Sequence, residues 1–159
     1  MKLTTCICCL VFLCAGTGFS QVTSFSVNKQ SFVSPTVESM AYLMQHIDSL
    51  KWNEVLLPLG FKSLPTSMKV NILEYDKKVN GMSQYIGYDD GYGVLTIIWK
   101  DESGKTLISG NLKKALKGKD YNTPGFYKTD YKGTGLVIGI ESSKAKVINE
   151  MITVEFERK

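Results

Sequence analysis

The chain has 159 residues, of which 43% are hydrophobic, and 19 lysine and arginine residues against 15 acidic ones give it a net charge of +4. This composition excludes a disordered chain and suits a globular domain with a hydrophobic core. The charge is too mild to predict a nucleic-acid partner, and Arg158 is the only arginine. Because arginine is the residue best suited to bidentate phosphate binding, a phosphate-reading function is disfavoured as well.

The beginning of the chain has the layout of a cleavable secretory signal peptide. Lys2 precedes the mostly apolar run 3–15, and small residues at Gly18 and Ser20 favour cleavage after Ser20. The run is shorter than the about 20 apolar residues of a membrane span, so we expect no stable membrane anchor. We therefore predict that residues 1–20 are removed and that residues 21–159 form a single α+β domain.

The export signal also predicts where the protein works. A secreted or periplasmic location follows from it, and the absence of any Asn-x-Ser/Thr glycosylation acceptor favours a bacterial source. All four cysteines precede Ser20, so the mature chain is expected to contain none. This excludes a disulfide framework, a thiolate nucleophile and a cysteine-ligated metal. His46 is the only histidine, which excludes a histidine-rich zinc site, and we predict no metal and no cofactor.

Apolar residues at helical spacing predict a first helix over about 35–50. Ser34 is placed to cap this helix and Pro35 suits its first turn. His46 falls opposite the apolar stripe and is expected to be exposed, whereas Asp48 is interpreted as the cap of the following segment. That segment is expected to be a second short helix or a buried connection. The stripe consists of Val37, Met40, Ala41, Met44 and Ile47.

The remaining chain is dominated by β signals with one further helix. Two-residue turn signals at Asn80-Gly81 and Asp90-Gly91 predict a three-stranded antiparallel meander over about 68–100. The segment 105–117 fits an amphipathic helix ended by Gly118, with lysines on its solvated side. Further strands are predicted over residues 125–131, 135–141 and 147–157.

These elements predict an α+β fold with an antiparallel sheet of about six strands and two amphipathic helices packed on one face. The order of elements also allows two tandem α-β-β-β halves. Gly60-Phe61 and Gly125-Phe126 would then correspond, at an offset of 126 − 61 = 65 residues. In such a fold the sheet face opposite the helices is available for binding.

Two short motifs resemble ligand sites but are better explained as turns. Gly104-Lys105-Thr106 lacks the earlier glycine of a phosphate-binding loop, because Trp99 occupies that position. Asp89-Asp90-Gly91 lacks the alternating oxygen ligands of a calcium loop and suits a hairpin turn.

Tyrosines supply the candidate binding residues. Side chains that alternate along strands share one face, and exposed tyrosines suit protein contact because each ring offers a large area at low entropy cost. Half-buried tyrosines of an ordinary sheet are an equally good interpretation. The candidates are Tyr85, Tyr88, Tyr92, Tyr127 and Tyr131.

The function that these observations favour is an exported soluble binding module with a protein partner, such as an inhibitor or an immunity-type protein. We assign no catalytic residue, so an enzyme is the less favoured interpretation. One alternative is a small secreted hydrolase that uses Asp89, Asp90 or Glu141 for general acid and base catalysis. Another is a carrier of a small apolar ligand, with a cup-shaped sheet whose cavity is lined by Ile97, Ile138 and Val154.

Overall fold

The structure is a computed structural model that describes residues 22–65, 72–119, 121, 123–144 and 146–158. The predicted signal peptide and its cleavage site lie outside the described residues. The elements follow in the order β1 (Ser24–Val27), β2 (Gln30–Val33), α1 (Val37–Gln45), α2 (Ser49–Leu56), η1 (Leu57–Leu59), β3 (Lys62–Ser63), β4 (Ile72–Val79), β5 (Met82–Asp89), β6 (Val94–Asp101), α3 (Ser109–Ala115), β7 (Phe126–Tyr131), β8 (Thr134–Lys144) and β9 (Ile148–Phe156).

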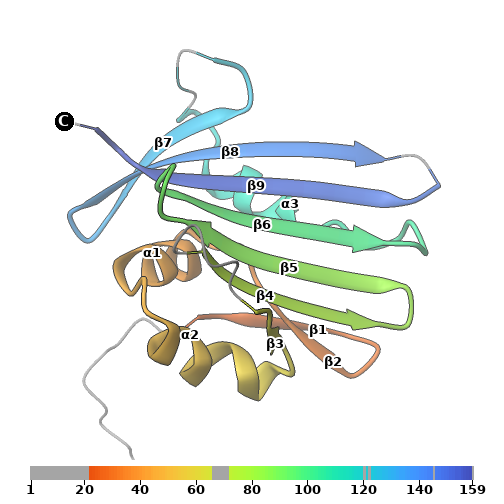
Figure 1. Ribbon diagram of the computed structural model, residues 1–159. Helices are drawn as coiled ribbons and strands as arrows, with labels where there is room; N and C mark the ends of the chain where they lie inside the picture. The colour runs from red at the N-terminus through yellow and green to blue at the C-terminus, as the bar shows by residue number, and fades with distance from the viewer. Residues whose placement is uncertain (1–21, 66–71, 120, 122, 145, 159) are drawn as a thin grey trace, which may run out of the picture.

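One antiparallel sheet of seven strands forms the centre of the molecule (Figure 1), in the order β3-β4-β5-β6-β9-β8-β7. The α+β class is confirmed, with seven strands in the main sheet instead of about six. The extra strand is β3, whose two residues are too few to give a periodic signal. No helix of the described part of the chain is long and apolar enough to cross a membrane.

All three α-helices contribute to one hydrophobic core on one side of this sheet, which we call the covered face. Met40 and Met44 from α1, Trp52 from α2 and Leu112 from α3 belong to a single cluster of buried residues. This cluster also contains the inward side chains of the central strands, namely Ile86, Leu95, Ile97, Ile138, Ile152 and Val154. The prediction that the helices pack on one face is therefore confirmed.

A β1–β2 hairpin, which the sequence analysis did not identify, lies on the same side of the sheet. Phe25 and Phe32 of the hairpin pack against Trp99 of β6, with ring centroids 5.6 and 4.9 Å from that of Trp99. The hairpin turns at Asn28-Lys29, where both residues have positive φ angles of 49° and 62°. This turn contains no glycine, so the usual hairpin signal is missing.

The helix predicted over 35–50 ends earlier, as α1, and the following segment, predicted as a second short helix or a buried connection, forms the helix α2. Thr36, and not Ser34, caps α1, because its hydroxyl accepts a hydrogen bond from the Ser39 amide at 3.2 Å. The helix ends at Gln45, and Asp48 then caps α2 by accepting from the Leu50 amide at 2.6 Å. The interpretation of Asp48 as a cap is confirmed, and this cap is the reason that one continuous helix over 35–50 was wrong.

The predicted order α-β-β-β occurs twice, but at a different offset from the one expected. The meanders β4-β5-β6 and β7-β8-β9 meet at the β6–β9 ladder, which pairs residues 94–101 with 148–155. The first residues of β6 and β9 are 148 − 94 = 54 residues apart, and those of β4 and β7 are 126 − 72 = 54 residues apart. Gly60-Phe61 precedes the short β3 whereas Gly125-Phe126 opens β7, so the 65-residue offset was wrong. A duplication as the origin of the halves stays a prediction.

Candidate functional site: the open face of the sheet

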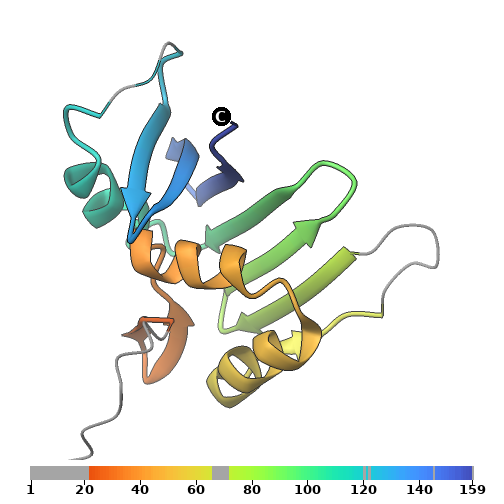
Figure 2. The same ribbon diagram turned by 90° about the vertical axis from the view of Figure 1, so that its left-hand side faces the viewer.

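The face of the seven-stranded sheet opposite the core is covered by no helix of the described residues, and we call it the outer face. Side chains alternate between the faces along each strand. In β6, for example, Leu95, Ile97 and Trp99 are buried on the covered face, whereas Ile98 is 39% exposed on the outer face. Figure 2 shows the helices and the hairpin gathered on the covered side of the strongly twisted sheet.

A row of four small residues crosses the middle of the outer face. The register aligns Gly87 of β5 with Thr96 of β6, Thr96 with Thr153 of β9, and Thr153 with Gly139 of β8. This row is nearly symmetric about the β6–β9 ladder, like the topology itself.

Two aromatic side chains cover the glycines at the ends of this row. A Cβ atom on Gly87 would lie 2.3 Å from the Tyr85 hydroxyl, and one on Gly139 would lie 2.9 Å from Phe126 Cε1. Only glycine leaves room for a ring to lie flat on the strand at these positions. Tyr85 and Phe126 are thereby held against the sheet, with Phe126 37% exposed.

An apolar pair lies in the neighbouring row, directly beside the small residues. Ile98 of β6 is the cross-strand partner of Met151 of β9, and the row continues to Tyr85 on one side and Glu141 on the other. A shallow open depression of about 290 Å³ is lined by Ile98, Met151, Glu141, Ser142, Ser143, Asn149 and Glu150. The outer face thus combines apolar centres with polar surroundings, which is the usual composition of a protein-binding surface.

Tyr85 is fixed in position by a hydrogen bond. Its hydroxyl donates to Glu74 Oε1 of β4 at 2.7 Å. Burial raises the pKa of the Tyr85 hydroxyl well above its ordinary value, and the hydrogen bond and negative charge of Glu74 raise this pKa further. Tyr85 therefore stays protonated and acts as a hydrogen-bond donor, not as a base.

The structure separates the five candidate tyrosines. Tyr85 alone lies on the outer face; Tyr88 is three residues along the same strand and is therefore on the covered face, 6% exposed. Tyr127 and Tyr131 are half-buried and pack against the core cluster. Tyr92 is 79% exposed in the loop between β5 and β6. The expectation of a shared face fails because an odd residue spacing reverses the side-chain direction.

Of the three carboxylates proposed for hydrolysis, Asp89 and Asp90 are adjacent at the end of β5, but Glu141 lies far from both. Asp89 on β5 and Glu141 on β8 are separated by two intervening strands, which at about 4.8 Å per strand spacing amounts to about 14 Å along the sheet. Paired catalytic carboxyl groups in glycoside hydrolysis lie within about 10 Å. Asp89 instead accepts hydrogen bonds from the amides of Gly91 and Tyr92, which confirms the turn interpretation. The hydrolase hypothesis gains no support from this arrangement.

Two buried carboxylates hold the chain in place. Asp101 is fully buried and accepts hydrogen bonds from the Ser103 hydroxyl and from the amides of Ser103, Lys105 and Thr106. Burial alone would raise the pKa of Asp101, but these hydrogen bonds outweigh it and lower that pKa below its ordinary value. The amides after Gly104 are thus occupied by a carboxylate of the chain itself, which confirms the interpretation of this segment as a turn.

Glu150 of β9 plays a similar part at the start of α3. Its carboxylate, 1% exposed, accepts from the Ile108 amide at 2.6 Å and from the Ser109 amide and hydroxyl. It joins α3 to the sheet, and its hydrogen bonds to chain donors explain why a carboxylate is buried here.

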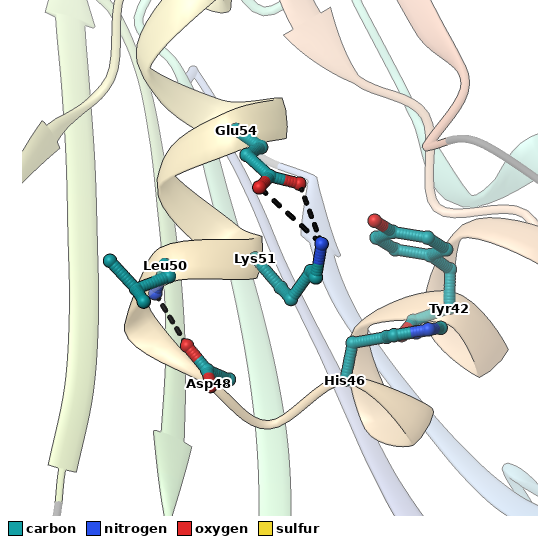
Figure 3. A network of polar contacts seen from close by, with 6 residues as sticks. All are labelled: Tyr42, His46, Asp48, Leu50, Lys51 and Glu54. Atoms are coloured by element: carbon teal, nitrogen blue, oxygen red, sulfur yellow. Dashed lines mark hydrogen bonds and ion pairs between the residues drawn. The ribbon is translucent and has the colours of Figure 1, made fainter.

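The single histidine lies at the α1–α2 junction, where Figure 3 shows it stacked on Tyr42. The ring centroids are 4.4 Å apart, and Nδ1 lies 2.9 Å from the Tyr42 carbonyl oxygen. His46 is half-buried, so the expectation of an exposed side chain was wrong; the stacking on Tyr42 is the reason. Asp48 turns away to cap α2. No group of three metal-ligating side chains occurs among the described residues.

The three residues proposed to line a ligand cavity belong to the packed core. Ile97, Ile138 and Val154 are each 0% exposed and lie in the cluster that the helices complete. Their placement gives the carrier hypothesis no support.

Comparison with models of protein families, with curated proteins and with solved structures found no match to this chain. The site must therefore be interpreted from its own geometry. Ile98, Met151 and Phe126 were not predicted from the sequence, because they come to one face only through pairing between strands remote in sequence. The one available signal was the run Ile97-Ile98-Trp99, which makes β6 apolar on both of its faces.

Proposed function

We propose that this protein is an exported binding module that engages a protein partner through the outer face of its sheet. The observation that carries the proposal is the uncovered Ile98–Met151 pair beside the Gly87–Thr96–Thr153–Gly139 row. Thr96 and Thr153, in the middle of this row, are partly exposed and leave space for side chains of a partner. The apolar pair and the two held aromatic rings offer rigid contact area. An inhibitor or immunity-type protein, which covers part of another protein, would use such a surface.

The test is a pull-down from extracellular and envelope fractions with the chain that starts at Gln21. The test variant carries Ile98→Glu together with Met151→Lys. Because these residues are direct cross-strand partners, the new opposite charges still pair and the sheet is retained, but the apolar contact is lost.

The matched control carries Leu50→Glu and Leu57→Lys at other exposed apolar positions, 70% and 46% exposed. The proposal expects one stoichiometric partner that the outer-face variant loses and the control keeps, with affinity reduced at least about tenfold in the former. Capture of the same partner by both folded variants would contradict the proposal.

A further inference from the structure

The two edges of the β1–β2 hairpin differ in what lies beside them. It forms its own two-stranded sheet on the covered side of the main sheet. One edge, along β2, faces strands β4 and β5, and the other, along β1, pairs with no strand of the described residues.

The β2 edge is closed by side chains of the main sheet. The Gln84 side chain accepts a hydrogen bond from the Val33 amide and donates one to the Val33 carbonyl, both at 2.8 Å. The Lys77 ammonium donates to the Ser31 carbonyl at 2.9 Å. These contacts leave no place for a further strand on this side.

The β1 edge, by contrast, presents its backbone groups to solvent. Ser24 is paired with Val33 and Ser26 with Ser31. Opposite residues of an antiparallel pair direct their backbone groups either both toward each other or both away. Because Val33 and Ser31 bond away from β1, Ser24 and Ser26 also direct their amide and carbonyl groups outward, and both residues are exposed. An edge of this kind is a template for one more strand.

A cavity adjoins this edge. Its volume is about 170 Å³, and its lining includes Phe25 of β1, Pro35, Ile108 and Asn111 of α3. A cavity of about 150 Å³ is large enough for a benzene-sized group, so this one accepts one apolar side chain. The hairpin and α3 lie on the same side of the molecule (Figure 2), and the lining residues Phe25 and Asn111 place the cavity between β1 and α3.

Two lysines are close neighbours of the lining residues along the chain. Lys105 lies just before the lining residues 106–108, and Lys114 follows Asn111 by one helical turn, on the same face of α3. Both are exposed, and neither forms a salt bridge within the described residues. The cavity surroundings therefore favour an occupant with acidic side chains.

We propose that the β1 edge binds an extended, acidic peptide segment of a partner protein as an added strand, with one apolar side chain in the cavity. Backbone hydrogen bonds to Ser24 and Ser26 provide the affinity, and the cavity with its lysines provides the selectivity. This site lies on the covered side of the sheet, and it stands independently of the outer face.

The test starts from a phage library of random eight-residue peptides, panned against the chain that begins at Gln21. Selected peptides are then synthesised, and their affinity is measured for three variants. Ser26→Pro removes an outward amide without breaking a bond to β2, because proline is accepted on a strand edge that faces solvent. Ser26→Thr keeps this amide and serves as the matched control. Asn111→Phe fills the cavity from the helix and leaves β1 unchanged.

The proposal expects selected peptides with an apolar residue near acidic ones, and at least tenfold weaker binding to Ser26→Pro and to Asn111→Phe than to Ser26→Thr. Amide hydrogen exchange at Ser24 and Ser26 slows when peptide is added. Thermal melts establish that each variant is folded. The proposal is overturned if no peptide is selected, or if the selected peptides bind all folded variants equally. It is also overturned if these amides are already protected by a second copy of the chain in a dimer.

Discussion

The two faces of the seven-stranded sheet are built from the same strands but differ in what lies against them. Ile97 and Ile98 are neighbours in β6, yet Ile97 is fully buried under the helices and Ile98 is 39% exposed. The covered face is stabilised by apolar packing and by buried carboxylates that each accept several hydrogen bonds. The middle of the outer face consists of small and apolar residues that no helix of the described chain covers. The comparison teaches that an apolar strand residue is buried or exposed according to what packs against its face of the sheet, not according to its type.

The largest expected effect comes from truncating the two isoleucines in turn. Ile97→Ala should lower the free energy of unfolding by about 2–5 kcal/mol, because it leaves a cavity in the core. Ile98→Ala should lower it by less than about 1 kcal/mol, because its side chain is already in contact with water. Urea denaturation of both variants measures the difference. Equal losses would mean that the outer face is buried in the folded chain.

A smaller effect is expected at Asp101, where a buried carboxylate supports the covered side. Asp101→Asn should lower the free energy of unfolding by about 1–3 kcal/mol, because an amide oxygen and nitrogen cannot replace two carboxylate acceptors. The loss is measured by thermal unfolding at neutral pH. A neutral effect would contradict the account of this turn.

The same residue predicts a pH dependence. Since folding lowers the pKa of Asp101, its contribution to stability is complete above the pKa of the unfolded chain and is lost as pH falls through the lower folded value. The wild-type chain should therefore lose more stability than Asp101→Asn as the pH is lowered below about 5, since an unfolded aspartate titrates near 3.9. Parallel unfolding curves across that range for the two chains would show that Asp101 is not responsible.

On the outer face, Gly87→Ala should cost about 1 kcal/mol, because the new Cβ displaces the Tyr85 ring and breaks its hydrogen bond to Glu74. A tyrosine fluorescence change would accompany the loss of stability. Gly110→Ala is a suitable control, since a Cβ there meets no atom within 4 Å. If Gly87→Ala were as stable as this control, the ring would not be held against the strand.

The last prediction is that a reducing agent has no effect on stability. If residues 1–20 are removed, both faces are stabilised without any disulfide, and a reducing agent should leave the melting temperature of the chain from Gln21 unchanged. A substantial decrease in that temperature on reduction would contradict the predicted cleavage site.

The α+β class and all main-sheet strands except the two-residue β3 could be predicted because their signals are local. Asn80-Gly81 marks the first hairpin turn of the sheet, and apolar periodicity marks the helices. The β1–β2 hairpin was missed because Asn28-Lys29 adopts positive φ angles without glycine. The single helix over 35–50 was wrong because Asp48 begins a new helix at a place where the apolar spacing continues.

The outer face could not be predicted because it depends on strand register. The contact of Ile98 with Met151 joins residues of different halves, and their alignment is fixed by the β6–β9 ladder. The tyrosine hypothesis identified Tyr85 but grouped it with Tyr88, which the odd spacing along β5 directs into the core, and with three tyrosines outside β5. Residue type alone therefore found one member of the surface and missed its neighbours.

The most direct test of the outer face as a binding surface is cross-saturation NMR on the complex with the captured partner. Saturation of the partner should attenuate the signals of Ile98, Met151 and Thr153 most strongly, and those of Leu50 and Ile97 little. Strong attenuation at Leu50 and Leu57 with intact signals at Ile98 and Met151 would contradict the account and would place the partner on the helices instead.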